Sequence, residues 1–110
     1  LYFLHSGYGC AGLARYEIHY ADGQTTALPL DPGKNIHNWW FGYQQGEETR
    51  LVPFLSRNTV DGKPAYRYLR VWEWQNPRHG VPIRSLSIVV DKVVNGYQQL
   101  SLVALSGVRW

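Results

Sequence analysis

The residues of this sequence that could support chemistry are mainly aromatic. Five of the 110 residues are tryptophans, and four of these five fall in two short segments, 35–41 and 65–77. Aromatic rings pack on the C–H faces of sugars, and nearby arginine, histidine and amide groups can bind hydroxyls. An apolar wall with a few polar groups is typical of a small-ligand site. The candidate ligand-binding residues are Trp39, Trp40, His37, Arg70, Trp72, Trp74 and Asn76.

Packing in a protein core is the competing role for each of these rings. In an extended strand, Trp72 and Trp74 point to the same face, so a core role for one predicts a core role for the other. Trp39 and Trp40 are adjacent, so a strand there would bury one ring and leave the other available to a ligand. Asn76 precedes a proline, where an asparagine side chain commonly caps a turn.

Patterns typical of catalysis or metal binding are absent from the sequence. The four histidines lie far apart without paired metal-ligand spacing, and the single cysteine, Cys10, has no nucleophile signature around it. Asp22 and Asp61 belong to Asp-Gly turns. Glu17 and Glu73 are the carboxylates that could meet across a sheet, as a glycosidase would require. We therefore predict no catalytic residue, no metal and no cofactor.

The composition indicates one globular domain over residues 1–110. The hydrophobic fraction is 45%, which is enough apolar side chains for a single core, and the charged fraction is only 17%. The formal charge is +3, and the arginines form no basic run, so we expect no nucleic-acid partner. No apolar run approaches the roughly 20 residues that cross a membrane, and no signal peptide is recognisable. We therefore expect no membrane partner.

Alternating apolar and polar residues predict short antiparallel strands. The strongest signal is a hairpin in which residues 15–21 and 24–30 are joined by Asp22-Gly23. Residues 6–9 and 42–50 are predicted loops, and Pro53 places its strand at a sheet edge. No segment has a sustained helical period. The fold is therefore predicted to be all-β, an antiparallel β-sandwich or jelly roll of seven or eight strands. The other predicted strands cover 1–5, 35–41, 51–55, 65–77, 83–90 and 100–108.

The segment 65–77 is predicted to be the central strand. Its alternation places Leu69 and Val71 on one face, where they read as plain core residues. The opposite face is aromatic and is predicted to be either a second packing surface or a platform for a ligand, because buried indole and phenol groups need polar partners. The aromatic face carries Tyr66, Tyr68, Arg70, Trp72 and Trp74.

Four segments together resemble the signature of galactose-binding-like β-sandwich domains. They are YEIHYADG at 16–23, NIHNWW at 35–40, WEWQNP at 72–77 and IRSL at 83–86. They are similar to the family pattern Y-x-I-x-Y-x-D-G, N-I-x-x-W, W-x-N-P and I-x-S-I, with leucine for the last isoleucine. The opening residues 1–5 also resemble a family strand. Domains of this type are often longer, so the chain is expected to be either a compact version or one without upstream strands.

The resemblance implies a secreted, non-catalytic accessory module of a bacterial glycoside hydrolase. The leading hypothesis is a carbohydrate-binding domain whose exposed rings bind a polysaccharide. A structural calcium is implied by resemblance alone, since no acidic cluster favours one. The first alternative is a structural accessory or dimerisation domain that packs its aromatic face on a neighbouring enzyme domain or on a second copy. The second alternative is a small glycoside hydrolase.

Overall fold

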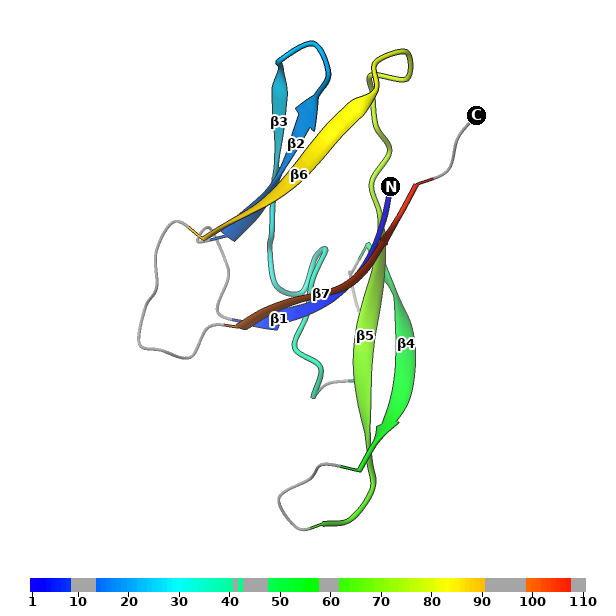
Figure 1. Cartoon of the computed structure of the whole chain (residues 1–110). Helices are drawn as coiled ribbons and strands as arrows, with labels where there is room; N and C mark the ends of the chain where they lie inside the picture. The colour runs from blue at the N-terminus through cyan, green and yellow to red at the C-terminus, as the bar shows by residue number, and fades with distance from the viewer. Residues whose placement is uncertain (9–13, 41, 43–47, 58–61, 91–98, 108–110) are drawn as a thin grey trace.

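Seven strands form two antiparallel sheets in the computed structural model, which describes residues 1–8, 14–40, 42, 48–57, 62–90 and 99–107 (Figure 1). A four-stranded sheet has the order β4-β5-β1-β7, and a three-stranded sheet has the order β3-β2-β6. The described residues contain no helix, so the all-β prediction is confirmed, and the two sheets are consistent with a β-sandwich. The strands are β1 (Tyr2–Tyr8), β2 (Ala14–Tyr20), β3 (Thr25–Pro29), β4 (Thr49–Ser56), β5 (Ala65–Glu73), β6 (Ile83–Val90) and β7 (Gln99–Ser106).

The predicted hairpin is confirmed as β2 and β3. Arg15 pairs with Pro29 and His19 with Thr25, and the turn between the strands contains Asp22 and Gly23. Gly23 has a φ of 90°, a backbone conformation that glycine adopts without steric cost. β2 is the central strand of its sheet and alternates strictly between buried and half-buried residues. The local sequence therefore determines both the turn and the inward face here.

The core lies between the two sheets and is aromatic at its centre. The Phe3 ring stacks on Tyr16 of the other sheet, with centroids 4.6 Å apart and planes 6° from parallel. Trp72 packs on Phe3, its register partner on the neighbouring strand of the same sheet, with ring centroids 5.2 Å apart. The buried apolar residues are Phe3, Ala14, Tyr16, Ile18, Tyr20, Leu28, Leu30, Ile36 and Trp72.

The aromatic face of β5 is the face that packs inward, and the prediction that Leu69 and Val71 are core residues is wrong. Both are half-buried, pairing with Val52 and Leu4 on the outer face. Trp72 and Arg70 are buried instead. β5 turns this face inward because its neighbour β1 places Phe3 and His5 on the same side, and directly paired residues of adjacent strands share a face.

Several predicted boundaries are also wrong: β5 ends at Glu73 and not at residue 77, β4 begins at Thr49 inside the predicted loop 42–50, and two other segments differ further. β1 continues through the predicted loop to Tyr8, because β7 pairs with it along its whole length. Residues 35–40 form a bridge and a turn instead of a strand, and Phe41 lies outside the described residues. The side chain of Asn35 accepts the N–H of Asp31 at 2.8 Å and donates to the Pro29 carbonyl at 2.9 Å. These local bonds engage backbone groups beside the segment and favour a compact loop over a strand.

Each edge strand carries a feature that hinders pairing with another chain. β3 has five residues and ends at Pro29, and β4 contains Pro53, whose predicted edge position is confirmed. β6 has a bulge at Arg84, the extra residue between the partners of His19 and Tyr20. β7 has a bulge at Val103, between the partners of Leu4 and His5. The extra residue of the β7 bulge is apolar, whereas that of the β6 bulge is charged.

We predict that Trp72→Ala lowers the free energy of unfolding by about 3–5 kcal/mol, the usual cost of removing a buried aromatic side chain. Leu69→Ala should cost less than half as much, because Leu69 is half-buried on the outer face. Urea unfolding followed by circular dichroism measures both values, and Trp72→Phe provides a milder change if the alanine variant does not fold. A larger loss for Leu69→Ala than for Trp72→Ala would contradict the inward orientation of the aromatic face.

Candidate functional site

The structure separates the seven candidate residues into three places. His37, Trp39 and Trp40 lie on the segment that follows β3 and runs toward β5 (Figure 1). Arg70 and Trp72 lie inside the core. Trp74 and Asn76 follow the end of β5. The structure therefore does not assemble all seven into one surface.

Backbone hydrogen bonds hold the tryptophan-bearing segment between β1 and β5. The His37 carbonyl accepts the N–H of Gly7 at 3.0 Å, and the Trp39 carbonyl accepts the N–H of Tyr68 at 2.8 Å. β1 pairs with β5 only from Arg70 to Glu73, so the segment occupies the edge of β5 that β1 leaves uncovered. Arg70 also donates from Nη1 to the Asn38 carbonyl at 3.1 Å. The segment is thus anchored to both neighbouring strands.

Side chains of the same segment shape the turn that presents Trp40. Asn38 donates its N–H to His37 Nδ1 at 2.8 Å, and its Oδ1 accepts the N–H of Trp40 at 3.2 Å. His37 and Asn38 are therefore engaged in local backbone bonding. Trp39 is half-buried, and its ring meets that of Trp40 edge-on, with centroids 6.4 Å apart and planes at 89°. Trp40 is 52% exposed, so its ring is the one presented to solvent.

Arg67 is a site residue that was not among the sequence candidates. Its guanidinium carbon lies 3.9 Å from the centroid of the Trp40 ring, and its Nη1 donates to the Tyr66 carbonyl at 2.9 Å. A cation over an indole face is attracted by the ring quadrupole. Alternation along β5 placed Arg67 opposite the aromatic face, and no local pattern linked it to a ring 27 positions earlier in the chain. The pair forms only when the segment docks on β5.

A glycine beside this turn allows the chain to approach β5 closely. A Cβ added at Gly42 would lie 2.6 Å from Cζ of the Tyr68 ring, well inside van der Waals contact. A larger residue at position 42 would therefore displace the Tyr68 ring or the backbone. Tyr68 also donates its N–H to the Trp39 carbonyl, so its backbone contacts Trp39 and its ring contacts Gly42.

Trp72 and Trp74 both pack on the core, in agreement with their shared strand face. Trp72 is buried against Phe3, and Trp74 is half-buried against the same cluster. Arg70 is fully buried beside His5, its register partner on β1. These three side chains support the fold from within, and the aromatic surface that remains accessible at the site is that of Trp40, with part of Trp39.

His5 links both sheets to the loop that precedes the site. Its Nε2 donates to the Asn35 carbonyl at 2.7 Å, because a carbonyl can only accept, so Nδ1 accepts the Tyr16 hydroxyl at 2.7 Å. The ring is fully buried and stacks near Trp72, with centroids 6.2 Å apart. Burial lowers the pKa of His5 to about 4, although the bond to Asn35 acts in the opposite direction. His5 is therefore neutral near pH 7.

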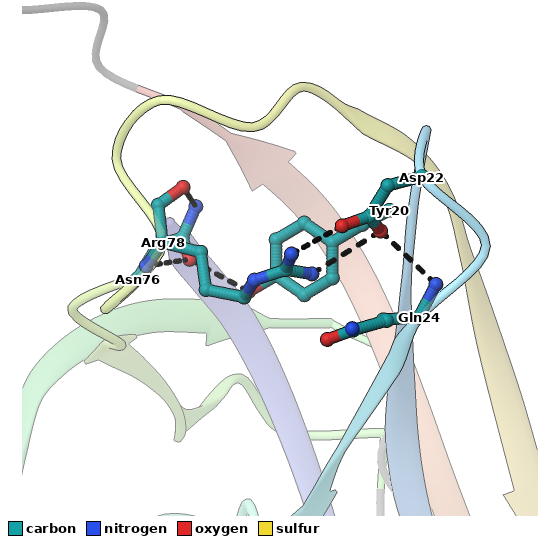
Figure 2. Close-up of polar contacts among 5 residues, drawn as sticks. All are labelled: Tyr20, Asp22, Gln24, Asn76 and Arg78. Atoms are coloured by element: carbon teal, nitrogen blue, oxygen red, sulfur yellow. Dashed lines mark hydrogen bonds and ion pairs between the residues drawn. The ribbon is translucent and has the colours of Figure 1, made fainter.

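Asn76 caps the loop after β5 and ties it to the three-stranded sheet. Its Oδ1 accepts the Tyr20 hydroxyl at 2.6 Å and the N–H of Arg78 at 3.0 Å (Figure 2). Its Nδ2 lies 3.5 Å from the Arg78 carbonyl. Tyr20 is fully buried, so this bond satisfies a phenol inside the core. The contacts of Asn76 are those of a structural cap.

Arg78 closes the same corner of the molecule. Figure 2 shows its side chain extending past the Tyr20 ring to the carboxylate of Asp22 in the hairpin turn. The guanidinium carbon lies 4.4 Å from the Tyr20 centroid, and Asp22 Oδ1 also accepts the N–H of Gln24 at 3.0 Å. The hydrogen bond from Arg78 lowers the pKa of Asp22, and the carboxylate raises the pKa of Arg78. The pair joins two loops at the surface, where ion pairs contribute little to stability.

The two carboxylates considered for glycoside hydrolysis lie on different sheets. Glu17 pairs with Arg15 at 2.9 Å on the outer face of the three-stranded sheet. Glu73 is exposed at the end of β5 in the other sheet. Beside Glu17, His19 bridges Thr25 and Ser87 through its two ring nitrogens, at 3.1 Å and 2.8 Å. Both nitrogens are thus engaged in cross-strand bonds.

No family model, curated protein or solved structure matches this chain. Within the described part of the chain, no three His, Cys, Asp or Glu side chains gather as a metal site would require. The same residues contain no helix long and apolar enough to span a membrane. The expectations about cofactors and membrane partners stay predictions.

We predict that acid destabilises the protein through His5. The unfolded chain takes up a proton near pH 6.5 and the folded state only near pH 4. The free energy of unfolding should therefore fall as the pH drops through this window, by about 3 kcal/mol in total. Urea unfolding of the wild type and of His5→Gln at pH 7, 5.5 and 4 measures the effect.

The difference between the two proteins isolates His5 from the carboxylates that titrate at low pH. His5→Gln should have the flatter profile, whereas His79→Gln, at an exposed position, should follow the wild type. Parallel profiles for the wild type and His5→Gln would show that His5 does not stay neutral in the folded state.

We also predict that Asn76→Ala lowers the free energy of unfolding by about 1–3 kcal/mol, because the Tyr20 hydroxyl loses its acceptor inside the core. Asp22→Asn changes only the exposed part of the same corner and should cost less. Thermal unfolding of the two variants in parallel measures this order. Equal losses would indicate that the ion pair, and not the asparagine cap, joins the loops.

Proposed function

We propose that this chain is a non-catalytic carbohydrate-binding domain with a galactose-binding-like β-sandwich fold. The observation that carries the proposal is the half-exposed ring of Trp40, which is held by a turn anchored to two strands. Sugar rings present C–H faces that pack on such a ring, and binding costs less entropy when the aromatic group is already fixed in place. The sequence resemblance supports the same conclusion about fold and ligand.

In this proposal the ligand contacts are Trp40 and the exposed part of Trp39, with Arg67, whose guanidinium lies over the Trp40 ring, as the polar group. His37 shapes the turn, and Arg70 supports it through the Asn38 carbonyl. The other three candidates do not contact the ligand in this proposal: Trp72 and Trp74 pack in the core, and Asn76 caps the loop after β5. The sugar site is thus smaller than the set of residues that the sequence singled out.

The domain would act outside the cell as an accessory module, beside an enzyme domain that carries out the chemistry. This setting follows from the resemblance to modules of bacterial glycoside hydrolases. Binding through one aromatic ring and a few hydrogen bonds requires no metal.

A second candidate function is self-association or packing on a neighbouring domain. Two edge strands, β6 and β7, expose large aliphatic side chains: Ile88 and Val90 are each 49% exposed, Val103 is 57% exposed and Leu105 is 43% exposed. Exposed apolar groups that cluster on a surface mark partner contacts. This candidate needs no sugar, and it places the functional surface away from Trp40.

We predict that Trp40→Ala weakens binding to the recognised polysaccharide at least about ten-fold, because a central aromatic contact commonly contributes more than the 1.4 kcal/mol that a factor of ten requires. Affinity electrophoresis in gels containing galactan, xylan, β-glucan or polygalacturonate measures the binding. Tyr66→Ala is the matched control, since Tyr66 is an aromatic residue that is 61% exposed on β5 and alternates to the opposite face of the strand from Arg67.

Thermal unfolding should show that both variants remain folded. Migration unaffected by every polysaccharide, together with a concentration-dependent dimer in light scattering, would replace this function with the second candidate.

A further inference from the structure

The Trp40 ring already carries a cation on one face, and this constrains what can bind there. The Arg67 guanidinium lies 3.9 Å above the indole and is tethered by its bond to the Tyr66 carbonyl. We propose that the recognised glycan is acidic, with a carboxylate bound by Arg67 and a sugar ring packed on Trp40. The inference rests on the proposed function, because it assigns a ligand class to the same site.

Arg67 has hydrogen-bonding capacity that its contacts with the described residues do not use. A guanidinium carries five N–H donors in a planar fork, and one group, Nη1, bonds the Tyr66 carbonyl. Within the described ranges, no carboxylate pairs with Arg67, in contrast to Arg15 and Arg78, which each pair with an acidic residue. A planar carboxylate matches this fork and can accept two N–H bonds at once.

The geometry of the pair divides the ligand between two groups. The guanidinium covers one face of the indole, so a sugar ring packs on the other face of Trp40. The Arg67 N–H groups that do not bond the Tyr66 carbonyl are the donors that this proposal assigns to a carboxylate on a neighbouring sugar unit. Both residues are held before binding: Asn38 Oδ1 accepts the backbone N–H of Trp40, and the Arg67 guanidinium donates to the Tyr66 carbonyl. Such pre-organisation reduces the entropy lost on binding.

The charge of the surrounding hairpin favours an anion. The hairpin of β4 and β5, residues 49–73, contains five cationic residues and two acidic residues, Asp61 and Glu73, so less than a quarter of the chain carries a net charge equal to the +3 of the whole sequence. Arg50 and Arg57 are exposed on β4 and directly after it. A local excess of one sign of charge attracts the opposite sign and raises its association rate.

A nucleic acid could use the same two kinds of side chain, but it fits the observations less well. Single-stranded nucleic acids are bound by several stacking rings along a cationic groove. The candidate site here presents Trp40, part of Trp39 and one arginine, and the exposed aromatic residue of β5, Tyr66, alternates to the opposite face of the strand from Arg67. A single carboxylated sugar chain needs no more than this pair.

The test measures binding of the whole chain to polygalacturonate and to galactan, a neutral polysaccharide, in 50 mM and 500 mM NaCl. We expect stronger binding to polygalacturonate, weakened by salt, and at least about a ten-fold loss in Arg67→Gln, as for a hydrogen bond between charged groups. Arg67→Lys should bind with intermediate strength, because it keeps the charge and loses the fork. Arg84→Gln, on the other sheet, should bind as the wild type does.

Thermal unfolding of each variant separates lost binding from lost folding. Preference for galactan, or polygalacturonate binding unchanged in a folded Arg67→Gln, would overturn the acidic class while the carbohydrate function stands. Binding to neither these nor any other polysaccharide would overturn the proposed function and this inference together. Tighter binding to single-stranded oligodeoxythymidine than to polygalacturonate would assign the site to nucleic acid instead.

Discussion

The two hydrogen bonds of buried His5 join three parts of the molecule that are distant in sequence. The ring belongs to β1, accepts the Tyr16 hydroxyl of the opposite sheet and donates to the carbonyl of Asn35 in the loop before the site. Buried polar groups cost free energy unless they are paired, so the arrangement tolerates few alternatives at this point. The spacing of the sheets and the path of the loop are therefore set by the same side chain.

The placement of Trp40 depends on this buried polar framework more than on a regular sheet. Residues 35–40 make no ladder of their own and are held by bonds from Gly7, Tyr68 and buried Arg70. A ring on such a segment can face solvent without exposing a strand edge. Core polar groups thus position a surface aromatic group, which explains why residues that resemble ligand contacts in the sequence, such as Arg70, act from the interior.

Strands and turns were predictable where the information is local. The hairpin of β2 and β3 follows from alternation and an Asp-Gly turn, and β6 has the predicted bounds. The prediction for residues 35–41 was wrong because the bonds of Asn35 to Asp31 and Pro29 outweigh strand propensity. The shared orientation of Trp72 and Trp74 was predictable, since it depends only on the two-residue period of a strand.

The sequence by itself determined the position of most strands, the hairpin turn and which side chains of β5 share a face. The tertiary structure decided which face of β5 is covered. Alternation specifies which side chains share a face but not which face points inward, and the pairing with Phe3 and His5 makes that choice. It also decided that Trp40 is the presented ring and that Arg67 covers one of its faces. That contact joins residues 27 positions apart, and no local propensity encodes such a distance.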